Sequence, residues 1–189
     1  YEISACLVGS EMCIRDRGSA AGISKRGVIA MMYRDFQDLK LSALGMGCMR
    51  LPVIGGDDAQ VDEDAAAEMV DYAMTNGVNY YDTAWGYHSG NSELVLGRAL
   101  ARHPRDSFYI ADKFPGYDLS NMPKVQEIFE AQLKKCQVDH FDFYLFHNVC
   151  EMNIDAYLDP RYGIHDYLME QKKNGRIPVS YTHLRAHET

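Results

Sequence analysis

Four polar side chains stand at or just past the ends of three apolar segments, and their chemical types suit proton transfer. Asp82 and Tyr87 lie in the run Asp-Thr-Ala-Trp-Gly-Tyr. Lys113 ends Ile-Ala-Asp-Lys, and His147 follows Phe-Tyr-Leu-Phe. A phenol can donate a proton, a nearby ammonium stabilises the phenolate that remains, and a carboxylate balances the ammonium. Together, these residue types predict a proton-donating site.

Each of the four residues also has a structural explanation when it is considered alone. Asp82 is compatible with a loop cap, and Tyr87 with an aromatic that packs at the rim of the fold. Lys113 is compatible with a solvated strand end, and His147 with a hydrogen-bonded core histidine. Their shared place at strand ends favours the functional interpretation, because a parallel β/α barrel brings those ends to one face, where barrel enzymes carry their active sites.

The segment from residue 31 to residue 177 alternates strand and helix patterns. A β-hairpin is expected at 33–43 with its turn near Asp38, followed by strands at 44–51, 79–82, 107–113 and 141–147. Helices are expected at 62–75, 91–103, 121–136 and 162–173, with Asp62, Asn91 or Ser92, and Asn121 at their starts. We therefore expect an α/β fold, a partial (β/α)8 TIM barrel in which the hairpin precedes the first four β/α units. No Gly-x-Gly-x-x-Gly follows a strand, which argues against a Rossmann site.

Composition restricts the partners and the compartment. The net charge of -8 argues against nucleic acid as a partner. No apolar run approaches the roughly 20 residues that a membrane span needs, and no signal peptide opens the chain. The five cysteines are odd in number and lack Cys-x-x-Cys spacing, which favours a reduced, cytoplasmic protein. No metal site is expected, because His88, His103, His140 and His165 lack metal-ligand spacing.

The two ends of the chain differ from the patterned middle. Residues 1–30 and 178–189 lack a sustained strand or helix period, and both resemble translated sequencing-adapter read-through at the ends of metagenomic gene predictions. We expect both ends to be non-native, with a natural disordered arm and tail as the alternative. A complete β/α barrel takes about 250 residues, whereas this chain has 189. Residues 31–177 are therefore expected to be the N-terminal half of a barrel.

Several motifs of the middle segment resemble the aldo-keto reductase family. They are Gly-Met-Gly-Cys-Met-Arg-Leu-Pro at 45–52, Asn-Tyr-Tyr-Asp-Thr-Ala-Trp-Gly-Tyr at 79–87 and Ser-Glu at 92–93. Lys113 and His147 follow in the matching order and at matching distances. The run Asp-Thr-Ala-Trp-Gly-Tyr-His-Ser-Gly-Asn-Ser-Glu resembles a bacterial branch whose longer members carry a ferredoxin-like iron–sulfur segment after the barrel. A 4Fe-4S cluster is thus expected only if such a segment follows.

The resemblance implies NADP(H)-dependent reduction of an aldehyde or ketone, with NAD(H) as an open alternative. Tyr87 would be the general acid, Asp82 and Lys113 its charged partners, and His147 the group that orients the carbonyl. The family's nicotinamide lies beside a backbone stretch that matches Gly47, Cys48 and Met49, with Asp82 close by. Trp85 and Asn148 are further candidates for substrate contact, beside His147. The family's other cofactor contacts lie on later strands, so the chain alone is expected to be inactive.

Two other functions remain open at this stage. A non-catalytic cofactor-binding or regulatory barrel subunit is one, although a sensor need not keep the proton donor. An isomerase or lyase on another barrel is the other, and the 189 residues contain neither the phosphate-binding loop nor the metal carboxylates that would favour it.

Overall fold

The structure, a computed structural model, describes residues 30–178. Residues 1–29 and 179–189, which hold nearly all of the two predicted non-native ends, lie outside the described residues. The strands are β1 (Tyr33–Phe36), β2 (Leu39–Ser42), β3 (Met46–Gly47), β4 (Tyr80–Asp82), β5 (Tyr109–Phe114) and β6 (Phe143–Phe146). The helices are α1 (Glu63–Thr75), α2 (Ser92–Leu100), α3 (Val125–Cys136), α4 (Ile154–Leu158) and α5 (Ile164–Lys173), with 3₁₀ turns η2 (Tyr87–Gly90), η3 (Arg105–Ser107) and η4 (Leu119–Lys124).

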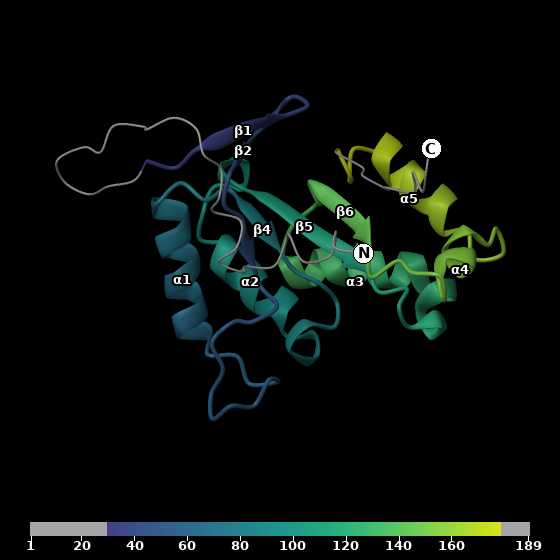
Figure 1. The fold of residues 1–189 in the computed structure, drawn as a ribbon, viewed down its shortest axis with the longest axis horizontal. Coiled ribbons are helices and arrows are strands. Elements are labelled where there is room, and N and C mark those ends of the chain that lie inside the picture. Colours follow the sequence, from purple (N-terminus) through teal and green to yellow (C-terminus); the bar gives the residue numbers. More distant parts are fainter. Residues whose placement is uncertain (1–29, 179–189) are drawn as a thin grey trace.

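Strands β3, β4, β5 and β6 form one parallel sheet in that order. Asp82 lies beside Gly47 on one side and Ala111 on the other, and Lys113 lies beside Leu145. Figure 1 shows α1, α2 and α3 gathered along the same side of this sheet. A parallel strand needs a crossover helix to reach its neighbour, which is why strand and helix alternate along the chain. The predicted partial barrel is confirmed.

The sheet is covered on two faces by different elements. The main core lies between the sheet and the helices and contains Tyr81, Ile110 and Phe129, all fully buried. On the other face, Phe143 packs with apolar residues of the β1–β2 hairpin, which forms a two-stranded sheet of its own. Phe143 and Tyr144 therefore serve opposite faces of β6, as the period of two along a strand requires. The predicted hairpin is confirmed.

Several predicted element ends are wrong by a few residues for identifiable reasons. Asp62 caps α1 as expected, accepting the N–H of Ala65 at 3.0 Å. Asn91 precedes α2 but does not cap it, because its side chain donates to the carbonyl of Ala59 at 2.8 Å. Asn121 does not open α3, since it lies in η4 together with Pro123. A proline disfavours α conformation in the residue before it, so α3 begins only at Val125.

Two further elements depart from the sequence expectation. The strand predicted at 44–51 is reduced to Met46–Gly47, which pairs in the described structure with the three-residue strand β4. A short helix, α4, occupies part of the segment between residues 147 and 162, where the pattern indicated a loop.

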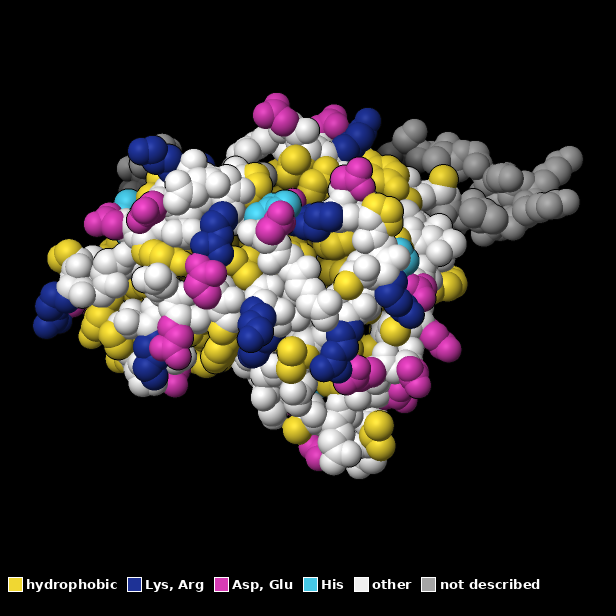
Figure 2. All heavy atoms as spheres, turned by 180° about the vertical axis from the view of Figure 1, so that it is seen from behind, with side chains coloured by type: hydrophobic (Ala, Val, Ile, Leu, Met, Phe, Trp, Pro, Cys, Tyr) yellow, Lys and Arg dark blue, Asp and Glu magenta, His cyan; other side chains and the backbone are white. Residues whose placement is uncertain are grey.

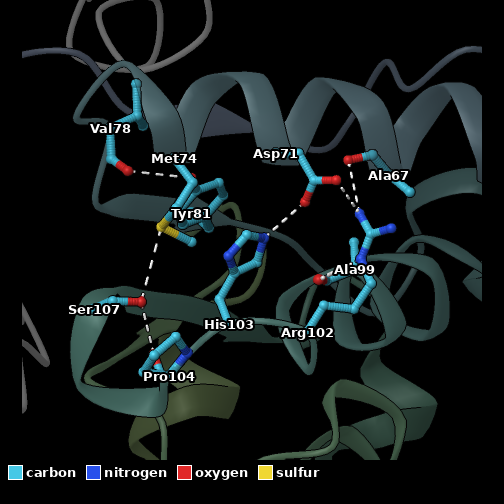
Figure 3. Close-up of polar contacts among 10 residues, drawn as sticks. All are labelled: Ala67, Asp71, Met74, Val78, Tyr81, Ala99, Arg102, His103, Pro104 and Ser107. Carbon is cyan, nitrogen blue, oxygen red and sulfur yellow. Dashed lines mark hydrogen bonds and ion pairs between the residues drawn. The ribbon is translucent and has the colours of Figure 1, made fainter.

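A polar cluster joins helix α1 to the segment that follows α2 (Figure 3). Asp71 on α1 accepts a hydrogen bond from His103 at 2.7 Å and forms an ion pair with Arg102 at 2.8 Å. Tyr81 on β4 donates to the carbonyl of Val78 beneath the same helix. These contacts give His103 a structural partner and hold α1 at a fixed distance from the chain that follows α2.

The surface mixes charged and apolar side chains, as Figure 2 shows for one face. A groove of about 750 Å³ lies between β3 and α1 and is lined mainly by apolar residues, among them Leu44, Met69 and Tyr72. Within residues 30–178, no helix is long and apolar enough to cross a membrane.

Candidate active site

The four predicted site residues come from three adjacent strands and one turn. Asp82 ends β4, Lys113 is the penultimate residue of β5, and His147 follows β6 directly. Tyr87 opens η2, a few residues after β4. Because the strands are parallel, their carboxyl ends meet at one edge of the sheet, and the contacts described below bring the four side chains together there.

Lys113 is the centre of this group. Its Nζ lies 2.6 Å from Asp82 Oδ1 and donates a second hydrogen bond to the carbonyl of Thr83 at 2.7 Å. Both side chains of the ion pair are mostly buried, with 14% of Lys113 and 28% of Asp82 exposed. Burial lowers the pKa of Lys113, but Asp82 and Tyr87 together outweigh burial and raise it. The ammonium is therefore held charged.

Tyr87 lies against both Lys113 and His147. Lys113 Nζ is 5.0 Å from the centre of the Tyr87 ring, a cation–π distance. The His147 ring meets the Tyr87 ring edge to face, with 5.7 Å between their centres. Burial, the largest effect, raises the pKa of Tyr87, Lys113 lowers it and Asp82 raises it again, so the pKa stays above its ordinary value. The lysine acts in the expected direction, but burial is the larger effect.

His147 is fixed by its backbone and is neutral. Its N–H donates to the carbonyl of Phe114 at 3.0 Å, and its carbonyl accepts the hydroxyl of Tyr157 at 2.9 Å. Burial, with Lys113 nearby, lowers the pKa of His147 to about 4. Its Nδ1 is buried without a partner in the described structure. The imidazole thus keeps hydrogen-bonding capacity that the folded chain does not use.

Comparison with known proteins decides the family. The family model described as "Aldo/keto reductase family" matches residues 43–177, well over half of the chain. The chain belongs to the aldo/keto reductase family. Among curated relatives, "Probable aldo-keto reductase 1" of Glycine max is 33% identical over 121 residues, covering 60% of this chain and 34% of the relative. "NADH-specific methylglyoxal reductase" of Escherichia coli is 27% identical, covering 74% of this chain and 47% of the relative.

A solved structure agrees with the fold. The holo form of aldo-keto reductase AKR11C1 from Bacillus halodurans superposes with a TM-score of 0.63 at 28% identity, covering 79% of this chain and 49% of that one. The chain thus spans less than half of the length of each of these relatives.

The stretch predicted to lie beside a nicotinamide has a fixed backbone. Cys48 N–H donates to the carbonyl of Asp82 at 2.8 Å, and the Cys48 carbonyl accepts the hydroxyl of Ser92 at 2.9 Å. The Cys48 side chain is fully buried, and burial raises the pKa of its thiol, which favours the protonated form. Open space surrounds Gly47, where an added Cβ would meet no atom within 4 Å. Met49 is 44% exposed.

The remaining sequence candidates lie beside the four-residue group rather than in it. Trp85 stacks on α3, where Lys135 Nζ is 3.9 Å from the centre of its ring. Asn148 is exposed, adopts a φ of 55°, and accepts a hydrogen bond from Asn153 through its carbonyl. No contact in the described structure tests a role for either in substrate binding, and that role stays a prediction.

Two tyrosines that the sequence analysis missed support the site. The Tyr117 ring meets His147 edge to face, with 5.0 Å between ring centres. Tyr157 on α4 donates to the carbonyls of both Phe114 and His147. Tyr117 had a visible signal, since it is an aromatic residue in the loop just past a strand end. Tyr157 had none, because it lies on a helix that the sequence pattern did not indicate.

His88 has the structural role expected for it. The side chain is buried, its Nε2 accepts the N–H of Leu51 at 2.9 Å, and its Nδ1 faces the carbonyl of Asp58 at 3.0 Å. An imidazole that accepts a backbone N–H through one nitrogen carries its proton on the other. His88 therefore ties the loop after β3 to η2. Among residues 30–178, no group of three or more potential metal ligands lies together.

Proposed function

We propose that this chain supplies the N-terminal half of a nicotinamide-dependent reductase that transfers hydride between the cofactor and an aldehyde or ketone carbonyl, with Tyr87 as the general acid. The observation that supports it best is the packing of Tyr87 against Lys113, whose ammonium is 2.6 Å from Asp82, and against the His147 ring. An acid, its charge partners and a neutral imidazole thus converge on one strand edge.

The four residues would divide the work of carbonyl reduction. Because burial keeps the pKa of Tyr87 above its ordinary value, the phenol carries its proton at neutral pH and can give it to the carbonyl oxygen. Lys113 stabilises the phenolate that forms, and Asp82 keeps the ammonium charged. Neutral His147 can donate one ring N–H to the same oxygen and so orient the carbonyl.

Part of a nicotinamide site fits the residues present. Open space at Gly47 leaves room for a flat ring, and the hydrogen bonds of Cys48 keep the neighbouring backbone rigid. Gly47, Cys48, Met49 and Asp82 would hold the nicotinamide end, and the cofactor, when bound, supplies the hydride. NADP(H) is the form that the resemblance implies. NAD(H) is the alternative, because one relative is named NADH-specific.

The chain by itself is proposed to be inactive, since the other half of the pocket would come from later strands. The three free cysteines of the described residues, Cys48, Cys136 and Cys150, support the reduced cytoplasm as the compartment. A 4Fe-4S cluster is proposed only for a longer form that carries a cysteine-rich segment after the barrel.

The test is an assay of a full-length reductase whose N-terminal half is residues 31–177 of this chain. Oxidation of NADPH and NADH is followed by absorbance across a panel of aldehydes and ketones. We expect turnover that Tyr87→Phe lowers by at least about 10²-fold, the lower bound for general acid catalysis. The matched control is Tyr109→Phe, a tyrosine at the opposite end of β5, which should leave turnover unchanged.

Near wild-type turnover in Tyr87→Phe would refute the role of Tyr87. Tight binding of the dinucleotide without turnover on any carbonyl would instead favour the non-catalytic, regulatory subunit.

A further inference from the structure

A second group of ionisable side chains is buried on the helix side of β5, behind Lys113. Neighbouring residues of a strand point to opposite faces, so Asp112 faces the helices while Lys113 faces the site. Asp112 and Glu93 of α2 are both fully buried, with 0% of each exposed. Buried carboxyl groups need charge or hydrogen-bond partners, and the partners of these two differ.

Glu93 has the partners of an ionised carboxylate. Its Oε2 accepts a hydrogen bond from Lys135 Nζ at 2.8 Å, and its Oε1 accepts one from Gln132 Nε2 at 2.9 Å. Lys135 also donates to the carbonyl of Gly90 at 3.3 Å. Gln132 is held in turn by the hydroxyl of Tyr144, which donates to its Oε1 at 2.5 Å. One ammonium is therefore matched with one carboxylate.

Among residues 30–178, no ammonium bonds to Asp112 on this side of the sheet. Its Oδ1 accepts the backbone N–H of Lys113 at 2.8 Å, and the Cys136 thiol is 3.9 Å from its Oδ2. The Lys113 ammonium is bonded to Asp82 on the other face. Burial and the neighbouring Glu93, which is within hydrogen-bonding reach, raise the pKa of Asp112 well above its ordinary value. With two buried carboxyl groups and one ammonium on this side of the sheet, the charges balance when one of the carboxyl groups is protonated.

We propose that Asp112 is protonated in the folded protein, donates its proton to Glu93, and is a positioning residue for Lys113. The link to catalysis rests on the proposed function, because it assumes that Lys113 works with Tyr87. The claim that Asp112 and Glu93 share a proton does not rest on the proposed function, because it follows from the burial and the partners of the two carboxyl groups. Lys135 and Cys136 of α3 and Tyr144 of β6 face the pair on the helix side, and the Lys113 ammonium acts on Asp112 from the other face of the sheet.

The positioning role follows from where the pairing of β5 with β4 ends. The register of β4 with β5 stops at the pair Asp82 and Ala111, and the N–H of Thr83 still donates to the Ala111 carbonyl. Two residues further along β5, side chains bond the backbone of Lys113. Asp112 Oδ1 accepts its N–H, and Gln132 Nε2 donates to its carbonyl at 3.1 Å. The carboxyl network thus fixes the point from which the catalytic ammonium extends.

The first experiment detects the proton directly in the full 189-residue chain. Infrared spectra at neutral pH should contain the carbonyl stretch of a protonated carboxylic acid. ¹³C labelling of aspartate side chains should shift this band, labelling of glutamate should not, and Asp112→Asn should remove it. A spectrum without such a band, or a band that follows the glutamate label, overturns the proposal.

The second experiment tests positioning by comparing substitutions at one site. In Asp112→Asn, the neutral side chain keeps an oxygen that accepts the Lys113 N–H and gains an amide group that donates to Glu93. The unfolding midpoint and the pKa of Lys113 should therefore be unchanged. Asp112→Leu removes both bonds, so it should lower the midpoint and shift the pKa of Lys113. That pKa is read from side-chain NMR of ¹³C-labelled lysine, assigned with Lys113→Met.

The matched control is Asp142→Asn on the neighbouring strand. Asp142 is nearly buried but accepts hydrogen bonds from Arg105 at 2.7 Å and from the N–H of Ile110 at 2.8 Å. Its substitution should lower the unfolding midpoint and leave the infrared band in place. If Asp112 were ionised, Asp112→Asn would remove a negative charge beside Lys113 and lower the pKa of Lys113, which overturns the proposal. Both readouts are independent of turnover, so a failed reductase assay leaves them intact.

Discussion

The pKa of Tyr87 is set by opposing effects on a single hydroxyl, of which burial and the Lys113 ammonium are the two largest. The Lys113 ammonium stabilises the phenolate, whereas burial penalises it, and burial is the larger effect. The phenol consequently keeps its proton in the resting protein. An acid that releases its proton only when charge develops on a nearby oxygen suits carbonyl reduction better than one that is already ionised.

At the residue scale, Lys113→Met should raise the pKa of Tyr87. The substitution removes the charge that lowers this pKa and leaves burial unopposed. The measurement is an ultraviolet titration of tyrosine in Lys113→Met, compared with the double variant Lys113→Met/Tyr87→Phe, so that the difference reports Tyr87 alone. The same pair is measured with Lys113 intact. An equal Tyr87 pKa in both backgrounds would show that the two groups do not interact.

His147 should make stability depend on pH in the acidic range. Its pKa is about 4 when folded, against 6.5 for an ordinary histidine. The unfolded chain takes up the proton first, so stability is fully present above about pH 6.5 and falls as the pH drops towards about 4. His147→Gln should flatten this part of the profile, measured by urea unfolding at several pH values.

The control for this profile is His165→Gln, because His165 is exposed on α5 with 58% of its side chain accessible. That variant should keep the wild-type slope. A slope that is identical in His147→Gln and the wild type would mean that His147 does not bind its proton more weakly in the folded state.

At the scale of elements, the helix layer depends on one close approach. Gly97 on α2 faces the backbone of α3, and a Cβ there would collide with the carbonyl of Lys135 and the backbone of Cys136. Backbone atoms cannot move aside as a side-chain tip can. The distance between α2 and α3 therefore depends on a residue without a side chain. The same distance sets the positions of Glu93 and Lys135 behind the site.

Gly97→Ala should destabilise the fold by about 1–3 kcal/mol, the usual cost of overpacking. The free energy of unfolding is measured by denaturant titration. Gly47→Ala is the matched control, because a Cβ at Gly47 meets no atom within 4 Å and the residue has no positive φ. Equal destabilisation by the two substitutions would contradict the close-approach argument.

At the scale of the whole molecule, apolar surface gathers where the sheet ends. The groove between β3 and α1 exposes Leu44 at 62%, Tyr72 at 73% and Met69 at 44%. In the described structure β3 pairs only with β4, so its other edge carries no strand. Clustered apolar side chains beside an open strand edge favour association between chains, unlike apolar residues scattered singly.

Tyr72→Lys should therefore raise the highest concentration at which the chain remains free of association. Light scattering over a dilution series measures this concentration. Met152→Lys is the control, because Met152 is 87% exposed but lies outside this groove, in the turn before α4. An equal gain in the two variants would show that added charge, rather than the groove, controls association.

From the sequence alone, the alternation of strands and helices was predictable except for α4, and so were the four residues that the structure brings together. Strand and helix periods are local properties of the sequence. Asp82, Tyr87, Lys113 and His147 are conspicuous because they are polar groups at the ends of apolar segments. Helix α1 was also predictable, since Asp62 caps it through its own side chain. Local rules failed where a longer-range contact competed, as at Asn91, whose side chain bonds Ala59 instead.

Only the tertiary structure decided how those residues behave. The direction of the Tyr87 pKa depends on how much of its ring is covered, and the low pKa of His147 depends on burial beside Lys113. The pairing of Glu93 with Asp112, and the support of His147 by Tyr157, join residues that are distant in sequence. Burial and electrostatic coupling depend on three-dimensional distance, and a residue pattern along one chain does not contain that distance.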